Sequence, residues 1–507
     1  MATDELLNQL RKYFGHAYFR SGQQEIIQDV MNGRDVLGIL PTGVGKSLCF
    51  QLPALLNKGV TIVISPLISL MVDQVKQLKA KGFKAVIALN SFMDLKERSK
   101  ELKQLDKYRL IYLSPELLQN PRVTLELKKL HVQLFVVDEA HCISQWGHEF
   151  RTDYLKLSQK IAELGNPPVL ALSATATPEV QKDIKQQLDK PDMTSHINQM
   201  DKPNMSFSVE QFLYPEDKAK RIISIAHQKR TPTMIYFSSR SAAEQLAEEL
   251  TNALEQRVAF YHGGMENMDR LLVQQQFMKD ELDIICCTSA FGMGVDKPNI
   301  RRVIHYHFPA QIESFIQEIG RAGRDCQPCA SLVLHTPNDQ VLPQLLLEKE
   351  VPREEDVRRV FSWLSQNSKL PSDEEMLEKM NLSESQWNFL KFHLEHVQII
   401  INGEVRQEDK LEAFRPEIVK RLNKRWKYKN QKYKQMLDWV LHKGCRRDRL
   451  YMPFQKGTAK PVVECCDYCG FSIDDLDIQK DSCNDSENFS SWKDRLDAVF
   501  LQESING

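Results

Sequence analysis

Short apolar runs alternate with longer amphipathic stretches over the first two thirds of the chain. Each run has the length and composition of a strand, and each is followed by a helical pattern. The runs fall into two successive sets: 36–40, 60–65, 110–114, 134–138 and 169–175, then 233–239, 258–263, 284–289, 302–308 and 331–336. Strands that alternate with helices predict parallel sheets covered on both faces, and two sets predict two α/β domains. The polar, proline-containing segment 189–205 is typical of the linker between them.

The pattern changes near residue 346, where strands become rare and charge increases. Three helices are predicted at 353–366, 372–380 and 383–396, and the second and third begin at serine caps. An apolar run at 397–406 with a central Asn-Gly pair predicts a hairpin. Three helices and a hairpin suit a winged helix-turn-helix, and they suit equally a small packing domain with no nucleic-acid role.

Length and composition limit the kind of protein. At 507 residues the chain is too long for one hydrophobic core. No apolar run reaches the roughly 18 residues of a membrane helix, and the N-terminus lacks the apolar core of a signal peptide. We therefore expect an intracellular protein with no membrane partner. Its eleven cysteines then favour free thiols or a metal over disulfides.

The expected domains follow from these patterns. They are a first α/β domain at 1–203, a second at 204–345, a helical or winged-helix-like insertion at 346–420, a cysteine-containing module at 421–470 and a tail at 471–507.

The overall net charge of −1 conceals one strongly basic segment. Residues 415–450 contain thirteen Lys or Arg and three Asp or Glu, interleaved with Trp426, Tyr428, Tyr433 and Trp439. Rings stack on bases while Lys and Arg meet phosphates, so this segment predicts a nucleic-acid surface. The alternative is a solvated helix face.

The segment "LPTGVGKSLCF" (40–50) follows a predicted strand and opens an apolar helix, as a phosphate loop does. Gly43 and Gly45 let backbone N–H groups approach phosphates. Lys46 supplies a positive charge to the β and γ groups, and Ser47 is a candidate Mg²⁺ ligand. The strict form of the loop begins with Gly, where this chain has Leu40. These residues predict an ATP site.

Two further motifs carry the chemistry of phosphoryl transfer. Asp138 follows the apolar "LFVV" and is expected to reach Mg²⁺ through water, while Glu139 orients or deprotonates the attacking water. In the second domain "QEIGRAGRD" (317–325) carries Arg321 and Arg324. They belong either to a salt-bridged helix face or to an arginine finger that reaches the γ-phosphate across a domain cleft.

Six stretches, taken in order, resemble the helicase motifs of the RecQ family: "LPTGVGKS", "SPLISLMVDQV", "DEAHCISQWGHEFR", "LSATAT", "TSAFGMGVDKPNI" and "QEIGRAGRD". The resemblance covers about residues 8–345 and resumes near 432–470. It implies two tandem RecA-like domains and a DNA-stimulated ATPase that moves 3′→5′ on single-stranded DNA and unwinds duplexes. It also implies ATP, Mg²⁺ and Zn²⁺ as cofactors, single-stranded and tailed duplex DNA as partners, and a role in recombination and repair.

The resemblance also implies roles for particular residues. A loop that couples DNA binding to hydrolysis would contain Ser144, Gln145, Trp146, His148, Phe150 and Arg151. Its rings can stack on bases, and its basic groups can sense phosphates. The alternative is that Trp146 and Phe150 are core aromatics. Asn90 and Arg240 occupy positions that resemble contacts to the DNA backbone.

The stretch "FGHAYFRSGQQEII" (14–27) resembles the family's adenine-recognition motif. Gln23 would hydrogen-bond the adenine edge and Arg20 would pack over the ring. His16 stands where relatives often carry a stacking aromatic, and Tyr18 lies nearby, so either ring is a candidate. Three more residues in the matching motifs complete the expected nucleotide site: Thr42, Gly292 and Asp296.

Cys466 and Cys469 form a C-x-x-C pair, whose turn lets two thiolates share one tetrahedral Zn²⁺. The resemblance implies a four-cysteine zinc module in which Cys445 of "GCRR" is another ligand. Relatives place the remaining ligand several residues before the C-x-x-C pair, where this chain has no cysteine. Cys465 is the nearest thiol and is the fourth expected ligand.

Other functions remain to be weighed. A double-stranded DNA translocase would hydrolyse ATP without separating strands. A DEAH-type RNA helicase would share the ATP motifs but would lack "SQWGHEFR". A non-enzymatic scaffold would need a broken nucleotide site. For the helicase, a nucleoid-associated place in the cytoplasm is expected in a bacterium and the nucleus in a eukaryote, with DNA-repair proteins as partners.

Overall fold

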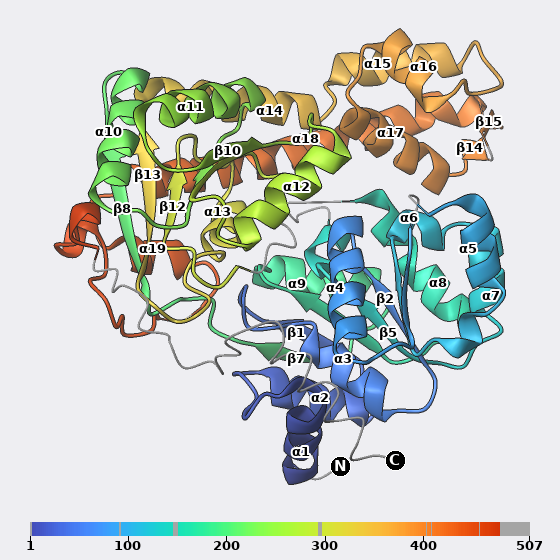
Figure 1. Ribbon diagram of the computed structural model, residues 1–507. Coiled ribbons are helices and arrows are strands. Elements are labelled where there is room, and N and C mark those ends of the chain that lie inside the picture. Colours follow the sequence, from blue (N-terminus) through green and yellow to red (C-terminus); the bar gives the residue numbers. More distant parts are fainter. Residues whose placement is uncertain are drawn as a thin grey trace.

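The structure is a computed structural model that describes residues 3–90, 93–144, 151–292, 297–401, 403–406, 408–455 and 457–476. Two helix-covered sheets lie next to each other, and a third, mostly helical unit stands beside them (Figure 1). Within these described ranges, no helix is long and apolar enough to cross a membrane.

The first domain is built on a seven-stranded parallel sheet with the order β3-β4-β2-β5-β6-β1-β7. Its strands are β1 Val36–Ile39, β2 Val60–Ile64, β3 Val86–Leu89, β4 Leu110–Leu113, β5 Val132–Val137, β6 Val169–Ser173 and β7 Thr194–Ile197. Its helices are α1 Thr3–Phe14, α2 Gln23–Met31, α3 Leu48–Leu56, α4 Ile68–Ala80, α5 Leu95–Leu102, α6 Pro115–Leu118, α7 Pro121–Leu127, α8 Leu157–Glu163 and α9 Pro178–Gln187.

Alternate residues of these strands enter two different cores. In β1, Leu37 and Ile39 lie in one core and Val36 lies in the other. Because helices cover both faces of the sheet, both sets of side chains must be apolar. This is why the strands were recognisable as continuous apolar runs.

The second domain has a six-stranded parallel sheet with the order β10-β11-β9-β12-β13-β8. Its strands are β8 Met205–Gln211, β9 Thr233–Tyr236, β10 Val258–Tyr261, β11 Ile284–Cys287, β12 Arg302–His305 and β13 Cys329–His335. Its helices are α10 Pro215–Gln228, α11 Arg240–Ala253, α12 Asn267–Met278 and α13 Ile312–Ile319.

The helical unit contains the three predicted helices and the predicted hairpin. Its elements are α14 Val341–Glu350, α15 Glu354–Leu364, α16 Asp373–Met380, α17 Glu384–His396, β14 Ile400–Ile401 and β15 Glu404–Val405. Ser372 and Ser383 cap α16 and α17, each accepting a backbone N–H with its hydroxyl. The long helix α18, Glu408–Val440, then extends back across the second domain, and α19, Arg446–Tyr451, follows it (Figure 1).

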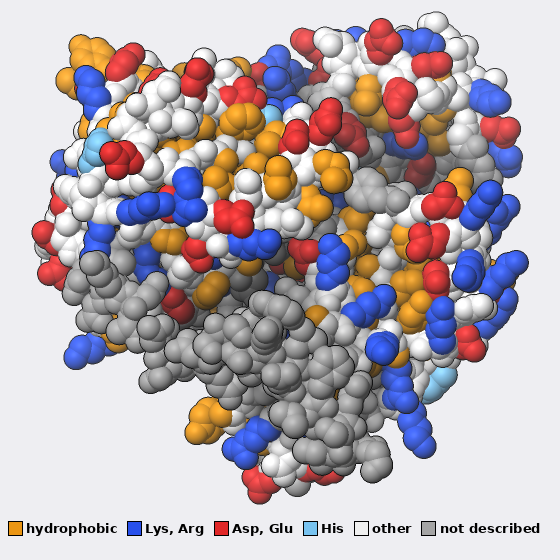
Figure 2. Space-filling view, in the orientation of Figure 1, with side chains coloured by type: hydrophobic (Ala, Val, Ile, Leu, Met, Phe, Trp, Pro, Cys, Tyr) orange, Lys and Arg blue, Asp and Glu red, His pale blue; other side chains and the backbone are white. Residues whose placement is uncertain are grey.

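The charge of this unit bears on its role. Residues 353–406 contain seven Lys or Arg and ten Asp or Glu. Figure 2 shows acidic and basic side chains interspersed over it. On α17, the third helix, Lys391 is paired with Asp373, and Glu395 lies 3.6 Å from Lys156 of the first domain. The unit is therefore acidic overall, and an ion pair joins it to the first domain.

Three strands of the two sheets were not expected, and one expected boundary falls inside a helix. The strands β3, β7 and β8 were not predicted, and β7 lies inside the segment 189–205 that was interpreted as linker. The linker is therefore confined to the residues between β7 and β8. The expected boundary at residue 420 falls inside α18, so the insertion and the cysteine module share one helix.

The prediction that rings of α18 stack on bases is wrong for two of the four rings, Trp439 and Tyr433. Trp439 is fully buried, with its ring centroid 4.6 Å from that of Phe315 in α13. Tyr433 is buried as well, and its hydroxyl donates to the Gln340 carbonyl at 3.1 Å. Lys432 pairs with the buried Glu313 of α13. This face of α18 is consequently an interior surface against the second domain.

Candidate functional site

The phosphate loop joins β1 to α3. Gly43 and Gly45 adopt φ angles of 84° and 81°, in the left-handed region that favours glycine. A Cβ atom on Gly45 would lie 3.2 Å from the Gln23 side chain, and one on Gly43 would lie 2.9 Å from Arg324 Cγ. The loop therefore needs glycine at both positions for backbone conformation and for space.

The two adenine-recognition candidates hold this loop. The Gln23 amide donates to the carbonyls of Val44 and Gly45 at 2.7 and 3.0 Å, while its oxygen accepts from the Arg20 amide at 2.8 Å. Arg20 donates through its guanidinium to the Gly43 carbonyl. A nucleotide that bonds to Gln23 or Arg20 would therefore contact side chains that themselves hold the conformation of the phosphate loop.

The two candidate stacking rings precede this contact. His16 and Tyr18 are both exposed, and Tyr18 is 77% accessible. Partial burial, then the positive charges of Lys81 and Arg20, lower the pKa of His16. A neutral, exposed imidazole can stack on a base as a phenol ring can, so the geometry leaves both candidates in place.

The acid pair lies opposite the loop lysine. Lys46 Nζ is 3.4 Å from Glu139 Oε1, and Asp138 Oδ1 accepts the Glu139 amide at 3.0 Å. Burial, followed by the negative charge of Glu139, raises the pKa of Asp138 to about 6. Glu139 has φ 47° and ψ 49°, a left-handed conformation that costs a non-glycine residue of order 1–3 kcal/mol. The turn after β5 is therefore strained at Glu139, and this conformation places the Glu139 carboxylate beside Lys46.

Sequence reasoning missed the residues that support this pair. His141 Nδ1 lies 3.0 Å from Ser173 Oγ and 3.4 Å from Glu139 Oε2, which links the end of β6 to the acid pair. Tyr154 donates through its hydroxyl to the Asp138 carbonyl at 3.2 Å. His141 and Ser173 lie within "DEAH" and "LSATAT", so the motifs contained a signal for both.

The two candidate finger residues have different surroundings. Arg324 packs its side chain against Gly43 of the phosphate loop, across the boundary between the two domains. Arg321 is 6% exposed and points into its own domain, where a Cβ on Gly292 would overlap its side chain and approach the Tyr236 hydroxyl. The structure brings Arg324, but not Arg321, to the loop that carries Lys46.

The domain boundary is closely packed at this point. A Cβ atom on Gly320 would overlap the Thr42 hydroxyl, so the end of α13 touches the phosphate loop. Thr42 therefore contacts the second domain, in addition to its expected place at the nucleotide. Ser47, the candidate Mg²⁺ ligand, immediately precedes α3.

The predicted coupling loop is described only at its two ends. Ser144 is fully buried and donates to Asp183 of α9 at 2.6 Å, and Arg151 lies 3.5 Å from Glu116. The other candidates, Gln145, Trp146, His148 and Phe150, lie outside the described residues, as does Asp296.

The two candidate DNA-backbone residues lie at the ends of structural elements. Asn90 follows β3 and is 5% exposed, and Arg240 is the first residue of α11. A Cβ atom on Gly264 would lie 3.0 Å from an Arg240 guanidinium nitrogen. This places Arg240 beside the glycine-containing turn that follows β10.

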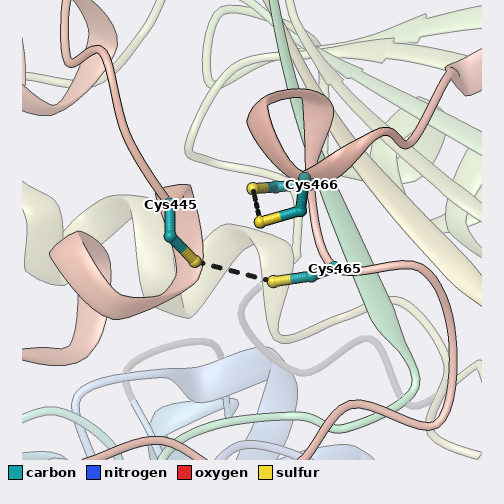
Figure 3. Close-up of side chains that lie close together, drawn as sticks. Cys445, Cys465 and Cys466 are labelled. Atoms are coloured by element: carbon teal, nitrogen blue, oxygen red, sulfur yellow. Dashed lines mark hydrogen bonds between the residues drawn. The ribbon is translucent and has the colours of Figure 1, made fainter.

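The four cysteines expected to bind zinc come together. Their ligand atoms all lie within 4.8 Å of one another, with Cys445 and Cys465 sulfurs 3.7 Å apart and those of Cys466 and Cys469 3.5 Å apart (Figure 3). Zn–S bonds in a tetrahedral site imply sulfur separations of about 3.8 Å. Burial raises the pKa of the Cys466 thiol, but the Arg446 amide, which donates to its sulfur at 3.4 Å, helps to hold the pKa below its ordinary value. The four donors therefore fit a zinc ion.

The part of the cysteine module that carries the four cysteines, residues 445–469, is attached to the edge of the second sheet. Phe207 of β8 donates its amide to the Cys465 carbonyl at 3.2 Å, and the Ser206 hydroxyl donates to the Glu464 carbonyl at 2.6 Å. Arg446 is paired with Asp467, which joins the two halves of the module. The module thus extends the sheet beyond its last strand.

Comparisons with known proteins agree with this geometry. Residues 20–184 match the family model "DEAD/DEAH box helicase" and residues 217–326 match "Helicase conserved C-terminal domain". The fold also resembles the helicase MrfA bound to DNA and AMPPNP, with a TM-score of 0.57 and 18% identity over 68% of this chain and 52% of that one. The DEAD-box helicase Mss116 gives a TM-score of 0.56 at 18% identity, covering 83% and 97%. The protein is therefore a helicase built on two RecA-like domains.

Curated relatives identify the family within this class. The chain is 38% identical over 505 residues to "Probable ATP-dependent DNA helicase RecS" of Bacillus subtilis, covering 99% of each. It is 41% identical over 351 residues to "ATP-dependent DNA helicase RecQ" of Haemophilus influenzae, covering 68% of this chain and 56% of that protein. The chain belongs to the RecQ family of ATP-dependent DNA helicases. These matches do not favour a translocase that leaves the strands paired.

Proposed function

We propose that this protein uses ATP hydrolysis to move 3′→5′ along single-stranded DNA and to unwind tailed duplexes. The observation that supports this most is the position of Arg324, which reaches the phosphate loop from the other domain. Hydrolysis then depends on the approach of the two domains, and a cycle of approach and separation is what converts an ATPase into a motor.

The nucleotide site can be divided by role. Lys46 neutralises the β and γ phosphates, and their competition for Lys46 releases Glu139 to orient the attacking water. Ser47 and Asp138 supply oxygen donors of the kind that Mg²⁺ prefers, and the ion would neutralise charge on the phosphates. Arg324 stabilises the transition state as the finger.

Arg321 acts from within the second domain. It buttresses the turn that carries Arg324, through its packing against Gly292.

The remaining candidate residues of the nucleotide site recognise the base and connect the two domains. Gln23 and Arg20 bind adenine and report its presence to the phosphate loop through their bonds to the loop carbonyls. His16 or Tyr18 stacks on the ring. Thr42, Gly292 and Asp296 complete the nucleotide contacts at the domain boundary.

Single-stranded DNA is the proposed polynucleotide partner. Asn90 and Arg240 contact its backbone, and the segment from Ser144 to Arg151 couples its binding to hydrolysis. Ser144 lies six residues after Asp138, and its side chain is anchored on Asp183. This contact supports a mechanical link between the segment and the acid pair.

The cysteine module binds one structural zinc ion through Cys445, Cys465, Cys466 and Cys469. Four thiolates without an open position make a closed site of the structural type. Because this module is bonded to β8, the ion would also stabilise the second domain.

We further propose a cellular setting from the bacterial relatives. The protein acts in the cytoplasm, at the nucleoid, in recombination and repair, together with other proteins of those pathways.

The test is a set of steady-state ATPase measurements without nucleic acid and with single-stranded DNA, duplex DNA or RNA. Strong stimulation by single-stranded DNA alone supports the proposal. Preference for duplex DNA would favour a translocase, and preference for RNA would contradict the DNA assignment. Unwinding of a 3′-tailed duplex but not of a matched 5′-tailed duplex then tests the direction.

A further inference from the structure

The segment that connects the two sheets makes specific contacts on both of its sides. Residues 201–204, "DKPN", lie between β7 and β8, and we call them the interdomain linker. One edge of the linker contacts the turn that carries the two arginines, and the other contacts the cysteine module. None of the residues 201–204 was a candidate site residue.

The first edge holds the arginine turn, residues 320–327. Lys202 Nζ donates to the carbonyls of Gly320 and Ala322 at 2.8 and 2.7 Å. Gly320 is the C-cap residue of α13, and Ala322 lies two residues beyond it. Carbonyls at a helix C-terminus lack intrahelical partners, and a positive charge is favourable there. Lys202 therefore fixes the start of the turn.

Asn204 fixes the rest of the same turn. Its side-chain amide donates to the carbonyls of Gly323 and Gln327 at 3.0 and 2.7 Å. Asn204 is 7% exposed, and a Cβ atom on Gly323 would overlap its amide. Four hydrogen bonds from two linker side chains thus enclose Arg324, whose own side chain packs on the phosphate loop.

The second edge of the linker is held in place. Arg447 pairs with the buried Asp201 and donates to the Lys202 carbonyl at 2.9 Å. Ala459 donates its amide to Asp201 at 2.9 Å, and Val462 donates to the Pro203 carbonyl at 3.0 Å. The cysteine module therefore clamps the linker, and a clamped linker can define the position of whatever its other edge binds.

We infer that Lys202 and Asn204 are positioning residues that place Arg324 against the phosphate loop. The inference rests on the proposed role of Arg324 as the finger. Displacement of a catalytic group by about 1 Å can cost on the order of 100-fold in rate, so loss of these hydrogen bonds should affect turnover strongly.

The test is a double-mutant cycle in the full-length protein, read as kcat and KM for ATP with saturating single-stranded DNA. Lys202→Met should lower kcat by ~10- to 100-fold and change the KM for ATP by less than about twofold. Lys202→Met should have no further effect in an Arg324→Ala background, because a mispositioned finger and a missing finger are equivalent. Asn204→Ala should follow the same pattern.

Two further variants separate positioning from folding. Lys202→Arg keeps a charged donor and should recover most of the lost kcat. Lys185 offers a matched control, since it also donates to a backbone carbonyl, that of Met193 at 2.7 Å, but within the first domain. Lys185→Met should leave kcat unchanged.

The outcomes test the positioning role of Lys202 separately from the proposed finger role of Arg324. An unchanged kcat in Lys202→Met, or an effect that adds fully to that of Arg324→Ala, overturns the inference and leaves the finger intact. An unchanged kcat in Arg324→Ala removes the finger role itself, and the inference falls with it.

Discussion

Arg324 of the second domain packs on Gly43 of the phosphate loop so closely that a methyl group on Gly43 would lie 2.9 Å from Arg324 Cγ. The neighbouring Arg321, only three residues away, is buried within its own domain. The two arginines of one motif therefore have separate surroundings, and the roles that we propose for them differ accordingly: one acts at the domain boundary and one supports the turn.

This separation predicts different consequences for the two alanine variants. Arg324→Ala should lower kcat by on the order of 10³-fold or more, with little change in melting temperature, because a finger acts on the transition state. Arg321→Ala should also lower the melting temperature, since it leaves a gap beside Gly292 and Tyr236. Steady-state ATPase and thermal unfolding of both variants check this. Equal melting temperatures for the two would contradict the assignment.

Gly43 of the phosphate loop has a matched control in Gly33, which lies between α2 and β1. Gly43→Ala should abolish ATP turnover, because the new methyl group both strains a φ of 84° and displaces Arg324. Gly33→Ala introduces similar strain at a φ of 73° but meets nothing within 4 Å. Each should cost about 1–2 kcal/mol of stability. Loss of turnover in the Gly33 variant would show that strain alone explains the result.

The cysteine module predicts a metal content. The purified protein should contain about one zinc ion per chain. Cys466→Ser should lose the ion and melt at a lower temperature, because bound metal stabilises the folded state. Cys326→Ser, at an exposed cysteine outside the cluster, should keep both. Elemental analysis and thermal unfolding measure the effects, and full zinc occupancy in Cys466→Ser would contradict the site.

Lys202 predicts a pH dependence. Burial lowers the pKa of Lys202 to about 8, and the positive charge of Arg324 contributes to this decrease. The nearby Cys329, Cys326 and Asp325 act in the opposite direction. As pH rises through 8 the folded protein loses this proton, and the weakened bonds to Gly320 and Ala322 should lower kcat. Lys202→Arg should flatten this alkaline decline, and a decline of the same size in that variant would exclude Lys202 as its source.

Stability should change in the opposite direction. The unfolded chain keeps the Lys202 proton up to its ordinary pKa near 10.5, so between pH 8 and 10.5 the unfolded state binds more protons than the folded state. The contribution of Lys202 to the free energy of unfolding should therefore rise with pH, by at most about 1.4 kcal/mol per pH unit. Denaturant titrations at pH 8 and 9.5, compared between the wild type and Lys202→Arg, check the sign.

Apolar runs predicted ten of the thirteen strands in the two sheets, because strands covered on both faces carry apolar side chains throughout. The strand β7, "TSHI", lies at a sheet edge and alternates between half-buried and exposed residues, so it has no such run. In β8, Ser206 and Ser208 are buried, and Ser206 is satisfied by the Glu464 carbonyl. Because the partner that satisfies this buried hydroxyl lies 258 residues away in the sequence, no local sequence pattern predicts the strand.

The site was predictable where chemistry is local. Lys46 and Glu139 lie where their motifs placed them, because each motif contains its own geometry. The four cysteines also come together as expected, but the resemblance to the family, not a local motif, implied Cys445. The motif "GRAGR" could not tell Arg321 from Arg324, since the difference lies in contacts with Gly292 and Gly43. Trp439 and Tyr433 of α18 were misinterpreted for the same reason. Helix α13 covers Trp439, and the spacing of a ring along α18 is the same whether protein or DNA covers it.

The clamp on the interdomain linker has a consequence for synthesis. The residues that hold Asp201 and Pro203 come from 447–462, near the end of the chain, whereas the phosphate loop and the arginine turn are complete by residue 327. A ribosome that has released both α/β domains still needs several seconds to add the cysteine module. Until then the nascent chain has every motif of an ATPase and lacks the contacts that hold the outer edge of the linker. The contacts that we propose to position Arg324 are therefore completed only after both α/β domains have been synthesised.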